Sequence, residues 1–503
     1  MSDIKSVLRD LGGIFIIIGF VTLFSLIVPL YFGEYGSNCP YDALGPILIT
    51  SAIYFGLGLP LYFSFKNADP PNFKSAMVTA ALAWFFISLV GSIPFWLIPY
   101  DKISLSSMAP LSAFFESMSG WTGTGLTMVG QENLLPHTLQ FWRSLIQWVG
   151  GVGVIVLTLS ILARPGTGSF VLYKGEARDQ RTHPSIISTV RTIWWIFLLF
   201  TIIGVIALIL IGSLTPDGMS SWESLNHAMT GIATGGFSVT DDSMTSFGAI
   251  SQIAIVILMI TGAIAFAAHY DLLKGRIKKF FSDAQFRALI VLIFLGLIGL
   301  TFVNLRLYGY DILRSLKYSG FQFTSAITCT GFASVENLST WTESGKLILA
   351  FAMIIGGAAG STAGGIKLFR AILLYKGVGW RIKRAISTPR RVFVHKLGDK
   401  SLSKEDAMDL INEAAIISFM WIILLFAGII VIMQTTENQT LSNSFFEVCS
   451  AQGNVGLTAG ITDINMSPVG KIMLIFNMWI GRLEIIPIIV LIKSMFGIKR
   501  NIL

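Results

Sequence analysis

Four short segments that end on glycine carry the most suggestive chemistry in this chain. Each lies between long apolar runs, and an apolar residue recurs ten places before each glycine, so a whole unit repeats. The aligned pairs are Phe115 and Gly125, Leu225 and Gly235, Phe321 and Gly331, and Phe446 and Gly456. Backbone carbonyl groups can replace the water around a cation, and small residues leave those groups accessible. The repeat therefore predicts an ion pore where the four segments meet.

The residue types favour backbone ligands over side-chain ligands. Glycine adopts a positive φ without a steric clash, which can turn successive carbonyl groups toward a common axis. The preceding residue is the stiff, β-branched Thr124, Thr234 or Thr330 in three copies and the similarly shaped Val455 in the fourth. The predicted cation site consists of Gly123, Thr124, Gly125, Ala233, Thr234, Gly235, Cys329, Thr330, Gly331, Asn454, Val455 and Gly456.

The composition requires a membrane. Of the 503 residues, 53% are apolar and 13% are charged, and the mean hydropathy is +0.71. Such a chain cannot present an ordinary polar surface to water. The net charge of +8 arises from basic residues gathered in particular loops, which indicates membrane topology and not a nucleic-acid partner. The three cysteines lack metal-ligand spacing, so neither a disulfide framework nor a metal site is expected. No cofactor is expected either.

The elements that must position the glycine segments are membrane-spanning helices, each needing about 20 apolar residues. Ten stretches qualify: 11–30, 45–65, 74–98, 139–163, 190–213, 248–271, 286–305, 346–376, 407–433 and 468–495. Shorter helical stretches near 110–121, 221–232, 315–328 and 442–452 precede the glycine segments and are predicted to be re-entrant pore helices. The predicted fold is an all-α polytopic membrane protein with ten transmembrane helices and four re-entrant pore loops in a pseudo-fourfold arrangement.

The repeat divides the chain into five predicted units. A helix, a pore loop and a second helix, repeated four times, account for eight spans, and the first two spans form an additional pair. The units are an N-terminal helix pair at 1–70 and pore repeats at 71–165, 166–280, 281–400 and 401–503.

The basic loops predict the orientation, because Lys and Arg collect on the cytoplasmic side. Most of them fall on one side if both termini are cytoplasmic. The main clusters are Lys174/Arg178/Arg181, Lys274/Arg276/Lys278/Lys279 and a run from Arg381 to Lys400 that includes Arg390 and Arg391. The glycine segments then face outward beside Glu132, Asp241, Asp242, Glu336 and Asp463. An acidic vestibule of this kind would concentrate cations.

A second glycine-rich segment, residues 356–365, interrupts the eighth apolar stretch and is here named the gate loop. Each glycine in a helix interior costs roughly 1 kcal/mol relative to alanine, so its five glycines favour unwinding beneath the pore segments. Close helix packing is the alternative, since Gly360 and Gly364 have GxxxG spacing. A phosphate-binding loop is disfavoured because the Gly-Lys-Ser/Thr ending is missing.

Arg482 lies about midway through the last apolar stretch, where a charge is costly and usually faces a bundle interior or an aqueous path. It is predicted either to project into the pore as an electrostatic barrier or to pair with Glu484 or another buried acid. Residues two apart on a helix do not face each other, which disfavours Glu484. The predicted gate consists of Gly356, Gly357, Gly360, Ser361, Thr362, Gly364, Gly365 and Arg482.

Three further charged residues are interpreted as structural. Arg143 lies within reach of Glu116 and Glu132 if it is near the outer end of its span. Glu116 and Glu447 recur nine residues before their glycines, and two carboxylates there suit anchors of pore helices better than ligands of a moving ion.

At these residues the chain resembles the TrkH/KtrB superfamily of potassium transport proteins, most closely the TrkH branch. The matching motifs are Phe-Phe-Glu at 114–116, Phe-Trp-Arg at 141–143, Thr-Gly-Gly-Phe at 234–237, the glycine-rich run at 356–367, Gly-Asn-Val-Gly at 453–456 and Gly-Arg-Leu-Glu at 481–484. The resemblance implies potassium uptake in a prokaryotic inner membrane by homodimers, with one pseudo-fourfold pore in each subunit. It also implies a mobile gate loop, an arginine in the pore and control by a cytoplasmic ring of TrkA-type nucleotide-binding subunits. Sodium-favouring relatives often carry Ser in place of the glycine at 125, so Gly125 implies potassium as the substrate.

Two other functions compete with a potassium channel. A symporter that couples potassium to sodium or protons is the nearer alternative, although coupling usually uses ionisable groups or broken helices at the midplane and inverted repeats. The repeats here run parallel. A membrane enzyme is disfavoured because the sequence has no HExxH or GxSxG motif and no paired intramembrane aspartates.

Overall fold

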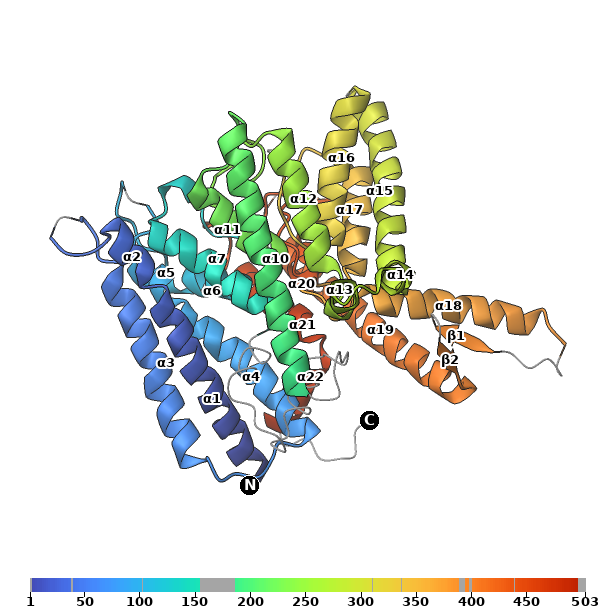
Figure 1. Cartoon of the computed structure of the whole chain (residues 1–503), viewed down its shortest axis with the longest axis horizontal. Coiled ribbons are helices and arrows are strands. Elements are labelled where there is room, and N and C mark those ends of the chain that lie inside the picture. Colours follow the sequence, from blue (N-terminus) through green and yellow to red (C-terminus); the bar gives the residue numbers. More distant parts are fainter. Residues whose placement is uncertain are drawn as a thin grey trace.

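The computed structural model describes residues 2–37, 39–101, 103–153, 186–309, 311–335, 337–388, 394–397, 400–437 and 439–495. These residues form helices and one short hairpin (Figure 1). The predicted basic cluster Lys174/Arg178/Arg181 lies outside the described residues, as do Arg390, Arg391 and Glu336.

Long apolar helices make this a multi-pass membrane protein. In the described part of the chain, six helical segments are long and apolar enough to cross a membrane, or up to eight if two bent pairs each count as one span. The six comprise α1 (Ser2–Phe24) with α2 (Ile27–Phe32), α3 (Leu44–Ser64), α4 (Phe73–Gly91) with α5 (Ile93–Leu97), α10 (Ile186–Leu214), α15 (Ala284–Tyr308) and α19 (Lys404–Thr435). Large apolar side chains such as Ile203, Phe294 and Phe419 are exposed on them. Lipid, not water, is the solvent that suits such surfaces.

Four of the ten predicted stretches differ from unbroken spans. Stretch 139–163 forms α7 (His137–Val152) and then leaves the described residues, while stretch 346–376 is divided into α17 (Glu343–Ile355) and α18 (Leu368–Ala385). Stretches 248–271 and 468–495 are bent by 104° and 112°. The bent pairs are α12 (Ala249–Ala263) with α13 (Phe266–Leu273), and α21 (Pro468–Leu483) with α22 (Ile486–Met495).

The two bends correct the expectation of continuous helices there. Glu484 and Ile485, at the second bend, both have positive φ angles, which a continuing helix does not allow. Hydropathy cannot reveal such bends, because the residues on both sides of each break remain apolar.

Four short helices occur close to the predicted positions. They are α6 (Pro110–Thr122), α11 (Ser221–Ile232), α16 (Ile312–Ile327) and α20 (Leu441–Gly453). Each helix has a recognised N-terminal signal. A proline is the first residue of α6, a Ser220–Glu223 capping box precedes and begins α11, and the side chains of Asp311 and Thr440 cap α16 and α20. The C-terminal halves of all four helices are buried. Short buried helices are therefore present where pore helices were predicted.

The short helices pack in a closed cycle. Each contacts the long helix that follows it in sequence and one long helix from the preceding unit. The contacts between units are α7 with α11, α12 with α16, α17 with α20, and α21 with α6. The last of these joins the fourth unit to the first, so the four C-terminal helix ends converge.

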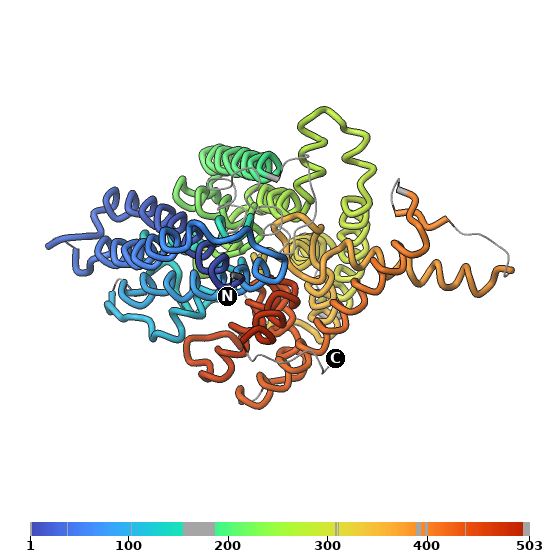
Figure 2. Tube along the Cα trace, turned by 90° about the horizontal axis from the view of Figure 1, so that it is seen from below, coloured from blue at the N-terminus to red at the C-terminus, as the bar shows by residue number. Residues whose placement is uncertain are grey.

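The remaining elements lie around this centre. The α1 and α3 helices pack against each other, and α1 packs on α4 at one edge of the molecule (Figure 2). At the opposite edge, α18 and α19 project from the bundle with an antiparallel hairpin beside them. The hairpin joins β1 (His395–Leu397) to β2 (Lys400–Leu402), with His395 opposite Leu402. The short α14 (Ile277–Ser282) and the 3-10 turn η1 (Glu132–Leu134) complete the described structure.

Candidate functional site

The four short helices end in loops of one shared backbone conformation. In each loop an amide donates a hydrogen bond of 2.8–2.9 Å to the carbonyl group five residues earlier. The residue before the donor has φ between 50° and 70°, and the residue after it is a glycine with φ between 76° and 100°. The loops, named here the ring segments, are residues 123–125, 234–236, 329–331 and 454–456.

This geometry corrects the sequence alignment of the second repeat by one residue. Thr124, Thr330 and Val455 are the amide donors of their loops, and Gly235 is the donor in the second loop. Gly236, with φ +76°, is therefore the equivalent of Gly125. The Gly-Gly pair made the two positions indistinguishable by residue type. The next residue carried the missing signal, because an apolar residue follows each of the four equivalent glycines.

The ring segments abut through bare backbone. Each ring segment ends on a glycine, and a Cβ atom built on that glycine would overlap a carbonyl oxygen of the next segment. The pairs are Gly125 with the oxygen of Gly235, Gly236 with Thr330, Gly331 with Val455, and Gly456 with Thr124. The order runs from the first segment to the fourth and returns to the first. Asn454 also bonds this last pair of segments, since its Nδ2 donates to Thr124 Oγ1 at 2.9 Å.

The four glycines line one small cavity of about 190 Å³. Glu132, Asp241 and Asp242 also line it, together with the cation Arg143. Three of the predicted vestibule acids are thus at the cavity. Asp463 is not among its lining residues and instead accepts a hydrogen bond from the backbone amide of Asn465.

Most of the predicted site residues are brought together here. The ring segments contain Gly123, Thr124, Gly125, Thr234, Gly235, Cys329, Thr330, Gly331, Asn454, Val455 and Gly456. Ala233 precedes its ring segment and has the position of Thr122 and Thr328, because the alignment was shifted by one residue. Gly236 was absent from the predicted set.

A polar side chain in each short helix braces the chain that leaves the ring. Glu116 accepts from the amide of Met128, and Glu447 accepts from the amide of Ala459, each at 2.8 Å. The same position in the third helix is Gln322, whose Oε1 accepts from the Ser334 amide at 2.8 Å.

The second helix uses a different side chain at this position. His227 lies 2.9 Å from the Ser238 hydroxyl through its Nε2. All four braces are fully buried. The interpretation of Glu116 and Glu447 as helix anchors is therefore confirmed, and only the corrected register reveals that His227 and Gln322 belong to the same set.

Arg143 ties the first unit to the second beside the cavity. Its Nε donates to Glu116 at 2.8 Å, its Nη1 donates to the Ser238 carbonyl at 2.8 Å, and its Nη2 lies 3.7 Å from Glu132. The predicted structural role of Arg143 is confirmed by these contacts. Burial raises the pKa of Glu132 to about 7, although the positive charge of Arg143 opposes this shift.

Gln147 is a ring contact that sequence analysis missed. Its Nε2 donates to the Gly235 carbonyl at 2.7 Å, and its Oε1 accepts from the Phe237 amide at 3.0 Å. It therefore holds both sides of the second ring segment. A lone glutamine within an apolar stretch was the available signal, because polar side chains inside a membrane usually have a specific partner.

Backbone hydrogen bonds join the gate loop to the break between α12 and α13. The amides of Ala358 and Thr362 donate to the carbonyls of Ala263 and Gly262 at 3.0 and 3.2 Å, and the Phe266 amide donates to the Gly360 carbonyl at 2.9 Å. Backbone groups freed by breaking a helix must find partners away from water. Here two interrupted segments satisfy each other.

The gate loop also contacts the second ring segment and the last residue of α20. Thr362 accepts a hydrogen bond from the Thr234 hydroxyl at 3.0 Å and donates to the Gly262 carbonyl at 2.9 Å. The Gly365 amide donates to the Gly453 carbonyl at 3.0 Å, and a Cβ built on Gly364 would overlap that same carbonyl oxygen. The loop therefore lies on the side of the ring where the short helices end.

The other predicted gate residues shape the loop itself. Gly356 continues α17 with a hydrogen bond from its amide to Ala352, and the Gly357 carbonyl accepts from the amide of Leu368 at 2.8 Å. Ser361 Oγ donates to the Ala358 carbonyl at 2.6 Å. The segment is a compact irregular loop, so the prediction that it unwinds is confirmed.

Arg482 bonds the gate loop to the end of α7. Its guanidinium donates to the Thr362 carbonyl at 3.3 Å and to the carbonyls of Gly150 and Gly151, the latter at 2.8 Å. It lies near the end of α21, one residue before the helix stops, and not midway through a continuous span. Glu484 instead pairs with Arg370.

Comparison with known proteins identifies the family of this chain. The family model for TrkH, described as a cation transport protein, matches residues 45–497. The chain belongs to the TrkH family. Its relatives include an uncharacterised cation transporter of Methanocaldococcus jannaschii, 36% identical over 98% of this chain and 96% of that protein. The Trk system potassium uptake protein TrkH of Salmonella typhimurium is 32% identical over 84% of this chain and 86% of its own.

A solved structure supports the same assignment. The crystal structure of the potassium transporter TrkH from Vibrio parahaemolyticus superimposes with a TM-score of 0.80 at 25% identity, covering 98% of this chain and 99% of the other. The resemblance noted from the motifs is thus confirmed over nearly the whole chain.

Proposed function

We propose that this TrkH-family protein takes up potassium through a channel-like pore, with the ion as substrate and the ring segments as its selectivity filter. The observation that carries the proposal is the closed order of four bare backbone segments around one cavity. Backbone oxygens in such a ring can replace the hydration shell of a monovalent cation. Relatives named as potassium uptake proteins support the choice of ion.

The helix ends favour cations at this position. The α6 and α20 helices end directly before their ring segments, and α11 and α16 end one residue earlier. The C-terminal end of a helix carries roughly half a negative charge, so four such ends lower the energy of a cation between them. Glu132, Asp241 and Asp242 supply a negative entrance, which raises the local cation concentration.

The proposed gate is the gate loop together with Arg482. The loop bonds to Thr234 at the helix-end side of the ring, and Arg482 bonds the loop to α7. Opening requires Thr362 to leave these partners. The charge of Arg482 would repel cations on the same path, which makes it an electrostatic barrier as well as a tether.

The assembly follows the family resemblance. We propose ten membrane spans with four re-entrant loops in a pseudo-fourfold arrangement, a homodimer in a prokaryotic inner membrane, and both termini in the cytoplasm. A ring of TrkA-type nucleotide-binding subunits would then meet the cytoplasmic face and control the gate loop.

Reversal potentials in proteoliposomes containing the purified protein test this function. A channel gives a reversal potential that follows the potassium gradient alone. A shift with sodium or pH at fixed potassium would replace the channel by a coupled symporter. Absence of ion movement from the closed and the regulator-activated protein would refute both.

A further inference from the structure

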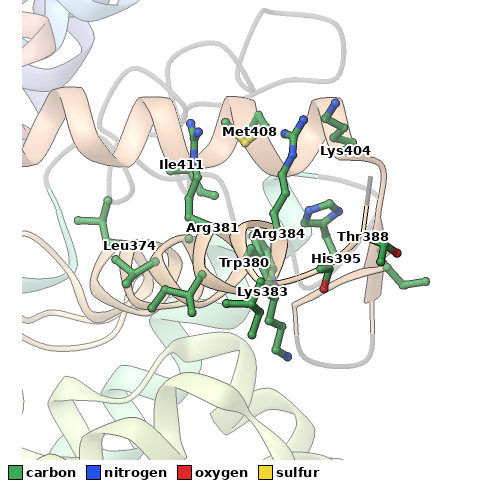
Figure 3. A pocket seen from close by; sticks show the side chains of 16 residues that line it. Leu374, Trp380, Arg381, Lys383, Arg384, Thr388, His395, Lys404, Met408 and Ile411 are labelled. Carbon is green, nitrogen blue, oxygen red and sulfur yellow. The ribbon is translucent and has the colours of Figure 1, made fainter. Parts of the chain in front are cut away.

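A wide groove lies at the projecting edge of the molecule, remote in sequence from the ring segments. It has a volume of about 1260 Å³ and lies between the C-terminal half of α18, the hairpin and the N-terminal part of α19 (Figure 3). The two helices pack tightly at Gly377, where a built Cβ would be 3.1 Å from Ile411 Cδ1. Lys376 Nζ donates to the Lys396 carbonyl at 2.9 Å, which fastens the hairpin to α18.

The groove combines two kinds of side chain. Its basic residues are Arg381, Lys383, Arg384, His395 and Lys404, and none of its lining residues is acidic. In the described part of the chain, Arg381, Arg384 and Lys404 form no ion pair. Figure 3 shows Arg381 and Arg384 on α18 and Lys404 on α19. An anionic ligand would therefore meet uncompensated positive charge.

The same wall carries exposed apolar side chains. Val378 and Ile382 of α18 and Ile386 directly after it are 60%, 56% and 80% exposed, lie four residues apart, and line the groove. A surface that offers both positive charge and exposed aliphatic side chains fits a lipid at the membrane boundary, with its phosphate at the charges and its acyl chain on the aliphatic stripe.

We propose that this groove binds an anionic phospholipid of the surrounding bilayer. A soluble anion would satisfy the basic residues but leave the aliphatic stripe exposed to water. A second copy of this chain that met the same face about a twofold axis would oppose one basic cluster to another. The proposal is independent of ion selectivity, so it stands or fails separately from the proposed function.

Lipid binding to the full-length protein in detergent tests the proposal by native mass spectrometry. The probes are dioleoyl phosphatidylglycerol and dioleoyl phosphatidylcholine. The test variant is Arg381→Gln/Arg384→Gln/Lys404→Gln. The control, Lys66→Gln/Lys74→Gln/Lys278→Gln, removes the same charge from exposed lysines elsewhere.

Wild type and control should prefer phosphatidylglycerol, and the test variant should bind it at least about tenfold more weakly, because each basic residue near an anionic headgroup contributes severalfold. An equal loss in the control, or no loss in the test variant, would overturn the proposal. If the triple variant does not fold, Arg384→Gln alone must still weaken binding relative to Lys66→Gln.

Two further arms identify the ligand. Val378→Ser/Ile382→Ser should weaken the binding of dioleoyl phosphatidylglycerol, and unchanged affinity would overturn the lipid in favour of a headgroup-sized anion. Displacement of the lipid by millimolar inorganic phosphate would do the same. If the triple variant keeps its lipid but no longer binds a purified nucleotide-binding regulatory subunit, the groove belongs to a protein partner and the proposal fails.

Discussion

The substitution Gly236→Ala tests both the filter and the corrected register. Gly236 has φ +76°, where a residue with a Cβ pays about 1–2 kcal/mol. The new methyl group would also overlap the carbonyl oxygen of Thr330, a backbone atom of the next ring segment that cannot turn away like a side chain. Relief of this overlap must displace a proposed ion ligand.

The expected magnitude follows from these two costs. Since 1.4 kcal/mol corresponds to a factor of ten, a loss of about 2 kcal/mol in differential binding lowers the potassium-to-sodium permeability ratio roughly thirtyfold. Bi-ionic reversal potentials in planar bilayers measure this ratio. Thermal unfolding of the same preparations checks that the fold survives.

Two matched alanine variants complete the test. A Cβ on Gly231 would make only ordinary contacts of 3.5 Å or more, so Gly231→Ala should keep the wild-type ratio. A Cβ on Gly235 would meet the movable side chain of Gln147, and displacing its hydrogen bond to the Gly235 carbonyl costs about 1 kcal/mol. Gly235→Ala should therefore lower the ratio less than Gly236→Ala. The reverse order, with Gly231→Ala unchanged, would refute the register derived from the backbone.

The other predictions concern the gate and two acidic groups. Thr362→Val removes a hydroxyl that makes three hydrogen bonds, so basal potassium flux into liposomes should rise severalfold; unchanged flux would show that these bonds do not hold the gate. Arg482→Ala should raise flux more than Arg482→Lys, which keeps the charge but not the forked geometry; equal flux in the two variants would mean that charge plays no part. Because the pKa of Glu132 is raised in the folded protein to about 7, the free energy of unfolding should fall as the pH rises from about 4.5 to about 7, and Glu132→Gln should flatten this slope in denaturant titrations. Burial alone would raise the pKa of Glu34, but hydrogen bonds from His137 and Thr138 outweigh burial and lower this pKa to about 2. Glu34→Gln should therefore cost stability at pH 7 and lose this effect as the pH falls from about 4.5 toward 2, and an equal cost at both ends would contradict the assignment.

Repetition in the sequence was sufficient to locate the pore region. The aligned glycines and the short helical stretches before them predicted where α6, α11, α16 and α20 end. This was possible because a ring of bare backbone requires glycine at specific φ angles, and that requirement is visible as residue type. The motifs also indicated the family over most of the chain, which the comparisons confirmed.

Glycine content alone could not settle the second repeat. Either glycine of the Gly235-Gly236 pair satisfies a pattern based on small residues, whereas the backbone hydrogen bonds and the apolar Phe237 that follows both assign the ring position to Gly236. The error also hid the brace position, where Glu116 and Glu447 share a role with His227 and Gln322. Such different side chains can be equivalent because each needs only one polar atom within reach of the outgoing chain.

The amino-acid sequence by itself determined that the protein lies in a membrane, which unit repeats, and where glycines interrupt the helices. It could do so because hydropathy and glycine content are local properties. Tertiary structure alone decided that α12 and α21 end in sharp bends, that the gate loop satisfies one of those breaks, and that Arg482 joins the loop to α7 instead of pairing with Glu484. These outcomes depend on which freed backbone groups and charges meet between segments that lie far apart in the sequence. No local pattern encodes that choice, since it minimises unsatisfied polar groups over the whole buried assembly.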